Sequence, residues 1–211
     1  MTPPTILLFL KAPRPGLVKT RLAKTLGEQK ATNVYRELVE ITLSKIPKNW
    51  PTRVHFAPAD TCLLMEKWLG SHLTYIPQPN GDLGHRLQTA CEQAFNDGAK
   101  GVILLGGDCP GLTSAHLEEC EESLLQNKPV IGPAEDGGYW LLGLPTPQPE
   151  LFCDIQWSTP EVLPITLDRF TQSNQTPVLL ETLFDVDEQE TYEKATSTGL
   201  LSKLADQTAT E

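Results

Sequence analysis

The segment GVILLGGD, residues Gly101–Asp108, decides the fold of this chain. It begins with an aliphatic run that no polar residue interrupts, which is typical of a strand buried on both faces of a mostly parallel sheet. Two glycines and Asp108 follow, and Pro110 favours an extended backbone at Cys109, so the strand ends sharply here. The segment therefore predicts a central strand with a carboxylate at its carboxyl end.

On both sides of this strand, apolar runs alternate with amphipathic segments of helical length. We expect the other strands at Thr5–Leu10, Arg53–Ala57, Leu73–Ile76, Pro129–Gly132, Tyr139–Leu144 and Pro177–Leu180. We expect helices at Lys19–Leu26, Gln29–Ile46, Cys62–Leu69, Leu83–Asp97, Ser114–Gln126, Pro160–Thr171 and Glu188–Thr196. Ser114 is expected to cap its helix. The alternation predicts an α/β protein with a mostly parallel sheet and helices on both faces.

The bulk properties of the chain indicate a single cytoplasmic domain. No linker divides the sequence, so we place residues 1–198 in one domain and residues 199–211 in a C-terminal tail. The first residues lack the pattern of a signal peptide, and every apolar run is far shorter than the roughly 20 residues of a spanning helix. The net charge of −10 argues against nucleic acid or an anionic membrane as a partner.

The loop KAPRPGLVKTRLAK, residues 11–24, follows the first strand and is rich in cations. Ligands of open α/β sheets bind where the strands end, so this loop is placed to bind an anion such as a phosphate. The residues expected to do so are Lys11, Arg14, Gly16, Lys19 and Arg21. The loop matches neither the Walker A pattern nor GxGxxG. The alternative is a basic surface turn.

Three further segments carry candidate site residues. Asp108 is well placed to hold Mg²⁺ against phosphate oxygens, although an aspartate before Pro-Gly is also ordinary turn chemistry. In QPNGDLGHRL, residues 78–87, the candidates for binding a phosphate or a nucleobase are Gln78, Gly81 and Arg86. In PAEDGGYWLLGL, residues 133–144, the candidates for contacting substrate are Asp136, Gly137 and Gly138, with a plain hairpin as the alternative.

The acidic segment LFDVDEQE, residues 183–190, places Asp185 and Asp187 two positions apart. In an extended backbone both carboxylates face the same side, which suits a shared cation. A solvated acidic turn before a helix explains the same residues. Taken alone, the segment favours that second interpretation.

Six motifs in order resemble a known family: KAPRPGLVKTRL, QPNGDLGHRL, GGDCPGL, AEDGGYWLLGL, WST and FDVD. The chain resembles the uncharacterised bacterial transferases of glycosyltransferase-A fold, of the radical-SAM/selenodomain-associated type, over residues 5–195. It is more distantly similar to 2-phospho-L-lactate guanylyltransferase and to molybdopterin nucleotidyltransferases. The resemblance implies a nucleotide-diphospho-sugar transferase fold.

The resemblance also implies roles for matching residues. Lys11, Lys19 and Arg21 match a phosphate-binding signature, Asp108 matches a metal-binding aspartate, and the pair Asp185/Asp187 matches a late acidic metal motif. Glycosyltransferases of this fold usually carry Asp-x-Asp at the central strand, where this chain has Asp108-Cys109-Pro110. That difference favours nucleotidyl transfer over glycosyl transfer.

The leading hypothesis is therefore a Mg²⁺-dependent nucleotidyltransferase that acts on an NTP and a small phosphorylated or carboxylated acceptor. Its catalytic residues would be Lys19, Arg21 and Asp108, and its metal ligands Asp108, Asp185 and Asp187. The alternatives are a glycosyltransferase that uses a nucleotide-sugar donor and a nucleotide-binding module without catalysis. The sequence predicts no oligomeric state.

Overall fold

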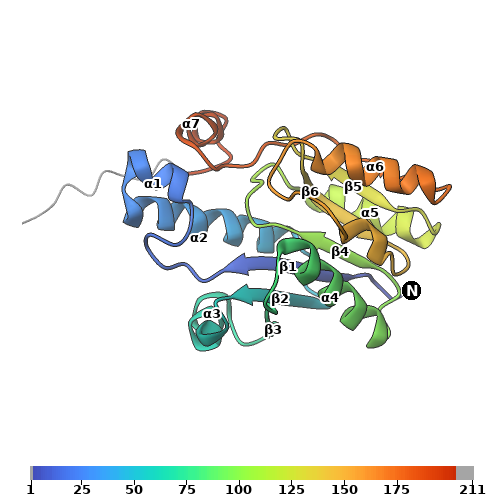
Figure 1. Cartoon of the computed structure of the whole chain (residues 1–211). Helices are drawn as coiled ribbons and strands as arrows, with labels where there is room; N and C mark the ends of the chain where they lie inside the picture. Colours follow the sequence, from blue (N-terminus) through green and yellow to red (C-terminus); the bar gives the residue numbers. More distant parts are fainter. Residues whose placement is uncertain (1, 203–211) are drawn as a thin grey trace, which may run out of the picture.

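The computed structural model describes residues 2–202, which form a seven-stranded sheet between helices (Figure 1). The strands are β1 (Thr5–Lys11), β2 (Thr52–Ala57), β3 (Thr74–Pro77), β4 (Val102–Leu105), β5 (Val130–Pro133), β6 (Tyr139–Leu144) and β7 (Val178–Leu179). They lie in the order β3-β2-β1-β4-β6-β5-β7. Only β6 runs antiparallel to its neighbours within the described chain. The predicted mostly parallel sheet is thus confirmed.

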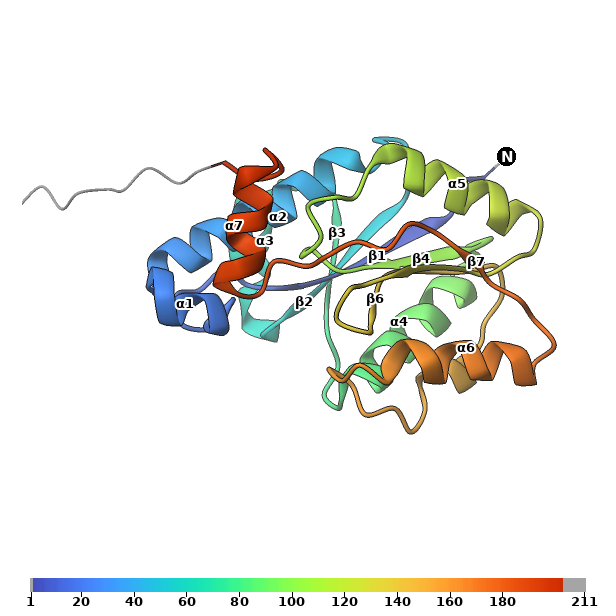
Figure 2. The same ribbon diagram turned by 90° about the horizontal axis from the view of Figure 1, so that it is seen from above.

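Helices cover both faces of the sheet, as predicted. They are α1 (Thr20–Leu26), α2 (Glu28–Lys45), α3 (Cys62–Leu69), α4 (Leu83–Asn96), α5 (Ser114–Leu125), α6 (Val162–Gln172) and α7 (Gln189–Ser197), with short 3-10 turns at Ala59–Thr61 and Pro149–Phe152. Figure 2 shows α2 and α5 on one side of the sheet and α4 and α6 on the other. Because the chain crosses between faces, the strands between these helices are buried on both sides.

The side chains of β1 contribute to two apolar clusters, one on each face of the sheet. Ile6 and Leu8 pack into the cluster that contains Val39 of α2 and Leu117 of α5. Leu7, between them, packs into the opposite cluster with residues of α4 and α6. All three side chains are fully buried, because successive residues of a strand point to opposite faces. The continuous apolar runs of the sequence are explained by this double burial.

One predicted cap is wrong. Thr113, not Ser114, caps α5: its hydroxyl accepts a hydrogen bond from the His116 amide, and His116 Nδ1 accepts one from the Thr113 amide. Ser114 is the first helical residue, and its hydroxyl donates to the carbonyl of Lys45. Thr113 and Ser114 are both good cap formers, so the sequence does not distinguish between them.

A third apolar cluster anchors the last part of the described chain near α1 and α2. Leu22, Leu38, Val186 and Leu201 are buried together in it. The Ser202 amide donates a hydrogen bond to Glu37 at 2.6 Å. The packed part of the chain therefore reaches beyond the boundary predicted at residue 198, and the rest of the predicted tail, 203–211, lies outside the described residues.

The strand ends bring the sequence motifs to one edge of the sheet. The parallel strands β1, β2, β3, β4, β5 and β7 all end at this edge, and β6 begins there. The basic loop follows β1, Asp108 follows β4, and the acidic segment follows β7. None of the helices between residues 2 and 202 combines the length and the apolar character needed to cross a membrane.

His55 of β2 is a buried titratable group that lines neither of the pockets at this edge. Its ring is 1% exposed, stacks on Phe9 at 5.0 Å, and has no hydrogen-bond partner for Nε2 among the described residues. Burial, with the nearby Arg53 charge, lowers the pKa of His55 to about 4. The folded protein therefore keeps the imidazole neutral where the unfolded chain protonates it.

We expect this histidine to make folding sensitive to acid. Between pH 6.5 and about 4 the unfolded chain binds the extra proton, so stability falls as the pH falls, by about 2–4 kcal/mol from this group. His55→Phe keeps the stack and removes the titration. Chemical denaturation at pH 7 and pH 4.5 should show a smaller acid-induced loss in the variant, whereas equal losses in both proteins would contradict the assignment.

Candidate functional site

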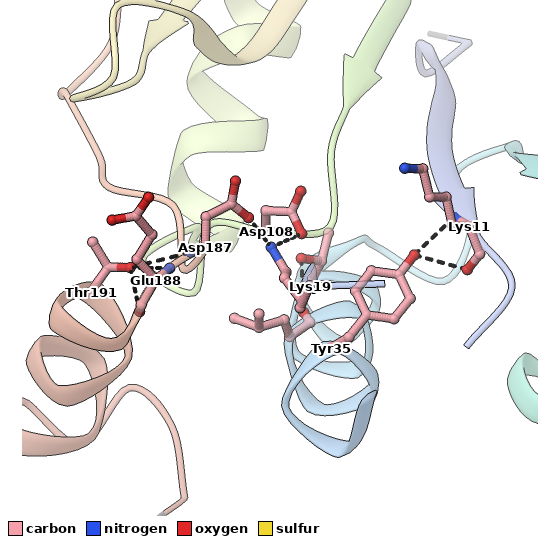
Figure 3. A network of polar contacts seen from close by, with 9 residues as sticks. Lys11, Lys19, Tyr35, Asp108, Asp187, Glu188 and Thr191 are labelled. Atoms are coloured by element: carbon pink, nitrogen blue, oxygen red, sulfur yellow. Dashed lines mark hydrogen bonds and ion pairs between the residues drawn. The ribbon is translucent and has the colours of Figure 1, made fainter. Parts of the chain in front are cut away.

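Lys19 lies at the centre of the site, between two carboxylates (Figure 3). Its Nζ is 2.6 Å from Oδ1 of Asp108 and 2.6 Å from Oδ1 of Asp187. The lysine side chain is 4% exposed, whereas each carboxylate is 44% exposed. Burial alone would lower the pKa of Lys19, but the two ion pairs outweigh burial and raise it. The ammonium group is therefore held charged.

Three separate segments position these groups. Lys19 precedes α1 in a left-handed conformation, with φ of 47°. Asp108 lies three residues after the end of β4, and its carbonyl accepts a hydrogen bond from the Val186 amide at 3.0 Å. Since Val186 is fully buried and its neighbours point the other way, the extended acidic segment presents Asp185 and Asp187 to the site. The predicted same-side arrangement of these two residues is what the structure has.

A pocket of about 570 Å³ lies beside the basic loop. The predicted residues that line it are Lys11, Lys19, Arg21, Gln78, Arg86, Asp108 and Asp187. Four of these are cations: three come from the basic loop, residues 11–24, and Arg86 comes from α4. We call this space the basic pocket. Its charge suits the phosphates of a nucleotide.

A second pocket of about 300 Å³ adjoins the first. The predicted residues that line it are Asp108, Asp136, Gly138, Asp185 and Asp187. Its walls are largely aromatic and aliphatic, with Phe9, Tyr139 and Trp157 among them. Among the described residues, no Lys, Arg or His lines it. We call this space the acidic pocket.

The two pockets meet at a shared border. Asp108, Asp187 and Ser158 line both, together with Phe9 and Leu83. The carboxylates that clamp Lys19 thus stand between a cationic space and an anionic one. A ligand that spans both pockets would pass these carboxylates.

Gln78 and Tyr35 line the basic pocket and make hydrogen bonds to the backbone beside it. The amide nitrogen of Gln78 donates to the carbonyls of Leu10 and His55, and its oxygen accepts from Arg86 at 3.3 Å. The Tyr35 hydroxyl donates to the Lys11 carbonyl and accepts from the Lys11 amide, both at 2.9 Å (Figure 3). Gln78, expected to contact ligand, therefore has its amide nitrogen bound to backbone and its oxygen to Arg86.

The two loops that line the acidic pocket, one with Gly137 and the other with Pro160, pack against each other. The Asp136 carboxylate accepts a hydrogen bond from the Gly138 amide at 2.9 Å. The Gly137 carbonyl accepts one from the Leu163 amide, and a Cβ on Gly137 would lie 2.5 Å from Cα of Pro160. The sequence made Gly137 a candidate for contacting substrate. In the structure, the absence of a side chain on Gly137 lets the two loops pack closely together.

The remaining predicted residues line neither pocket. Arg14 pairs with Asp60 on the surface at 3.4 Å. Gly16 and Gly81 both have positive φ, which suits glycine in a turn, and the Gly81 carbonyl accepts from Arg86 Nε. These residues, with Gly137, shape the loops of the site rather than its surface.

Several lining residues were missed by sequence reasoning. Tyr35 lies in an amphipathic helix, where an aromatic residue is normally interpreted as part of the apolar core. Trp157 and Ser158 belong to the WST motif, which entered only through the resemblance. Ser158 has φ of 62°, in the left-handed region, which is uncommon for serine. No pattern in the sequence signals that backbone conformation.

Asp185 carries an unbalanced charge in the acidic pocket. Burial raises its pKa to about 6, and repulsion from Asp187 and Asp136 adds to this. Crowding of carboxylates with a single buried ammonium leaves negative charge without a counterion. The pocket is therefore receptive to a cation.

The carboxylates fit a divalent metal that is shared with substrate. Within residues 2–202, no three His, Cys, Asp or Glu side chains are grouped so as to hold a metal by themselves. Asp108 and Asp187 nevertheless converge on one cation, the Lys19 ammonium. Mg²⁺ is usually bound by one or two carboxylates and completed by phosphates and water. The donor set therefore fits a divalent cation whose remaining ligands come from a bound molecule and water.

The adjacent glycines after β4 have different roles, which a matched pair of variants separates. A Cβ on Gly107 would lie 2.8 Å from Val39 in the core, whereas a Cβ on Gly106 meets nothing within 4 Å and faces the acidic pocket. We expect Gly107→Ala to cost about 1–3 kcal/mol of folding stability by overpacking. Gly106→Ala should fold normally, because its added methyl group points into the acidic pocket and meets no other atom within 4 Å. Thermal unfolding of both variants tests this, and equal stabilities would contradict it.

Comparisons with known proteins agree with this fold. The family model DUF2064, described as uncharacterized and conserved in bacteria, matches residues 42–159. No protein with a curated description matches the chain. A solved structure from Desulfovibrio desulfuricans G20, provisionally described as a nucleotide-diphospho-sugar transferase, is 32% identical, with a TM-score of 0.84 over 89% of this chain and 84% of that one.

More distant structures share the fold. A cytidylyltransferase from Leptospira borgpetersenii is 16% identical, with a TM-score of 0.58, and the match covers 96% of this chain and 89% of that one. Rv0371C from Mycobacterium tuberculosis, solved with manganese, is 14% identical, with a TM-score of 0.53 and coverage of 92% and 99%. The predicted nucleotide-diphospho-sugar transferase fold is confirmed. The narrower assignment to the radical-SAM-associated type stays a prediction.

Proposed function

This chain belongs to the DUF2064 family of bacterial proteins, and we propose that it is a transferase that uses a nucleotide-activated donor. The observation that carries the proposal is the Lys19 ammonium, buried between Asp108 and Asp187 where the basic and acidic pockets meet. A cation and two carboxylates at the border of two pockets suit the transfer of a group from a phosphate to an acceptor. The 32% identical nucleotide-diphospho-sugar transferase relative supports the same class.

The basic pocket holds the nucleotide phosphates in this proposal. Lys11, Arg21 and Arg86 supply cations around it, and Lys19 supplies one at the border with the acidic pocket. These groups stabilise the negative charge that develops on the leaving phosphate.

Asp108 and Asp187 would hold a divalent metal, with Asp185 beside them. When bound, Mg²⁺ or Mn²⁺ would neutralise phosphate charge and act as a Lewis acid. Manganese is present in the M. tuberculosis structure of the same fold. The chain's own part is to orient the phosphates with Lys19 and to present the carboxylates from β4 and the acidic segment.

Of the two transfer reactions, glycosyl transfer is the better supported. The sequence favoured nucleotidyl transfer because Asp108 stands alone after the central strand, but Asp187 supplies a second carboxylate at the same ammonium, which fits either reaction. The acidic pocket also offers no cation, among the described residues, to the phosphorylated or carboxylated acceptor expected for nucleotidyl transfer. Transfer of a sugar from a nucleotide-sugar needs no such cation there.

Donor hydrolysis tests the proposal without knowledge of the acceptor, because water can take the acceptor's place. The full chain is incubated at high concentration with Mg²⁺ or Mn²⁺ and panels of NTPs and nucleotide-sugars. Release of a nucleoside diphosphate from a nucleotide-sugar supports glycosyl transfer. Release of pyrophosphate from an NTP supports nucleotidyl transfer instead. Binding of a nucleotide with no product from any donor would leave the non-catalytic module.

A further inference from the structure

We propose that the acidic pocket binds an uncharged or cationic hydroxyl- or amine-bearing substrate and excludes phosphorylated and carboxylated ones. This inference rests on the proposed function, since it names the class of the second substrate. It begins with a separation of charge between two adjoining spaces. The cations that line the site lie in the basic pocket, and the acidic pocket has carboxylates alone as its charged lining among the described residues.

The carboxylates of the acidic pocket come from three segments and face a small space. Asp108 follows β4, Asp136 lies in the turn between β5 and β6, and Asp185 precedes the buried Val186. An additional phosphate or carboxylate in about 300 Å³ would meet these charges without a Lys, Arg or His in the described lining to match it. A metal held at the border by Asp108 and Asp187 would already be shared with the phosphates of the donor. Like-charge placement of this kind is how a site rejects a wrong ligand. Hydroxyl and amine hydrogens, by contrast, can be donated to carboxylate oxygens.

The rest of the wall suits a carbon skeleton with hydroxyl groups at its edge. Tyr139 and Trp157 meet edge to face with ring centroids 6.5 Å apart, and both line the pocket. Aromatic surfaces with a few polar groups are typical of pockets for small organic ligands. Ser158 and Thr159 add hydroxyls at the same wall.

The loops that carry these groups are fixed in relation to each other. The turn that presents Asp136 packs against Pro160 through Gly137, and the Leu163 amide donates to the Gly137 carbonyl at 2.9 Å. Trp157 and Ser158 lie just before Pro160 in the other loop. The Asp136 charge and the Trp157 ring therefore form one preorganised wall, so Asp136 is the residue we assign to charge selection.

Fluorescence quenching reads the charge of the pocket directly. Subtracting the signal of Trp157→Phe isolates the Trp157 component, which is then quenched with iodide, caesium and acrylamide. We expect caesium and acrylamide to quench Trp157 several-fold more efficiently than iodide. Asp136→Lys should raise iodide quenching, and Asp136→Asn, which keeps an acceptor for the Gly138 amide, should raise it less.

The control for these variants is Asp168→Lys, which makes an equal change of charge on α6. Asp168 lines neither pocket. Equal iodide and caesium quenching in the wild-type protein would overturn the proposal.

A series of acceptors that share one carbon skeleton but differ in charge tests the charge of the pocket through its effect on turnover. Glucose, glucosamine, glucose 6-phosphate and glucuronate are each added to the full chain with the donor found by hydrolysis. We expect the first two to accelerate donor consumption at least tenfold more than the last two, and Asp136→Lys to shrink that ratio. A preference for the anionic members, or no discrimination, overturns the inference. Failure of every donor would instead contradict the proposed function, and the quenching result would still decide the charge of the pocket.

Discussion

Lys19→Met is expected to lower donor turnover by at least about 100-fold, since it removes the cation at the border of the two pockets. It also leaves Asp108 and Asp187 facing each other without a counterion. Because both carboxylates are 44% exposed, water screens part of their repulsion, and we expect a stability loss of only about 1–2 kcal/mol. Turnover assays and chemical denaturation measure the two effects separately.

Lys24→Met is the matched control for this change. Lys24 lies on the same helix, α1, is exposed and lines neither pocket. The control should keep full turnover. Magnesium should raise the unfolding midpoint of Lys19→Met more than that of the wild type, because the freed carboxylates bind the added cation. A Lys19→Met protein with normal turnover would remove Lys19 from the proposed chemistry.

Asp108→Asn is expected to lower turnover by about 1000-fold or more while the protein still folds. The substitution removes one negative charge at the border of the pockets but keeps an oxygen that can accept a hydrogen bond from Lys19. The carboxylate is half exposed, so its loss leaves no deeply buried group unpaired. Kinetics with saturating Mg²⁺, together with thermal unfolding, separate catalysis from folding.

Asp97→Asn serves as the control for Asp108→Asn. Asp97 pairs with Arg53 at 2.7 Å, is 61% exposed and lines neither pocket. Loss of this surface pair should cost at most about 1 kcal/mol and leave turnover unchanged. Metal-dependent turnover that persists in Asp108→Asn would show that another group holds the metal.

Much of the fold could be predicted because its strands are strongly patterned. The run Val102–Leu105 is buried on both faces, and nothing in it competes with the strand interpretation. The site residues Lys19, Asp108 and Asp187 could be predicted individually because each follows or precedes an element at the carboxyl edge. The contact of both carboxylates with the Lys19 ammonium could not be predicted, because it depends on the packing of Val186 among residues of α1 and α2.

Other features of the site have no local signal. The division into two pockets of opposite charge depends on which loops meet, and the docking of Gly137 on Pro160 joins segments that the sequence shows only separately. The αL conformation of Ser158 is likewise imposed by its surroundings. The roles of the glycines have no local signal either, because a glycine can make room for a ligand or for a neighbouring segment of the chain, and only the packing distinguishes the two.

Calorimetric titration of nucleoside diphosphates into the full chain, with and without Mg²⁺, tests whether the basic pocket binds phosphates together with a metal held by Asp108. At least one diphosphate should bind in the basic pocket, and Mg²⁺ should tighten its binding at least tenfold in the wild type. In Asp108→Asn the diphosphate should still bind, but the magnesium effect should be lost. No binding by any nucleoside diphosphate, or a magnesium effect of equal size in both proteins, would contradict the account.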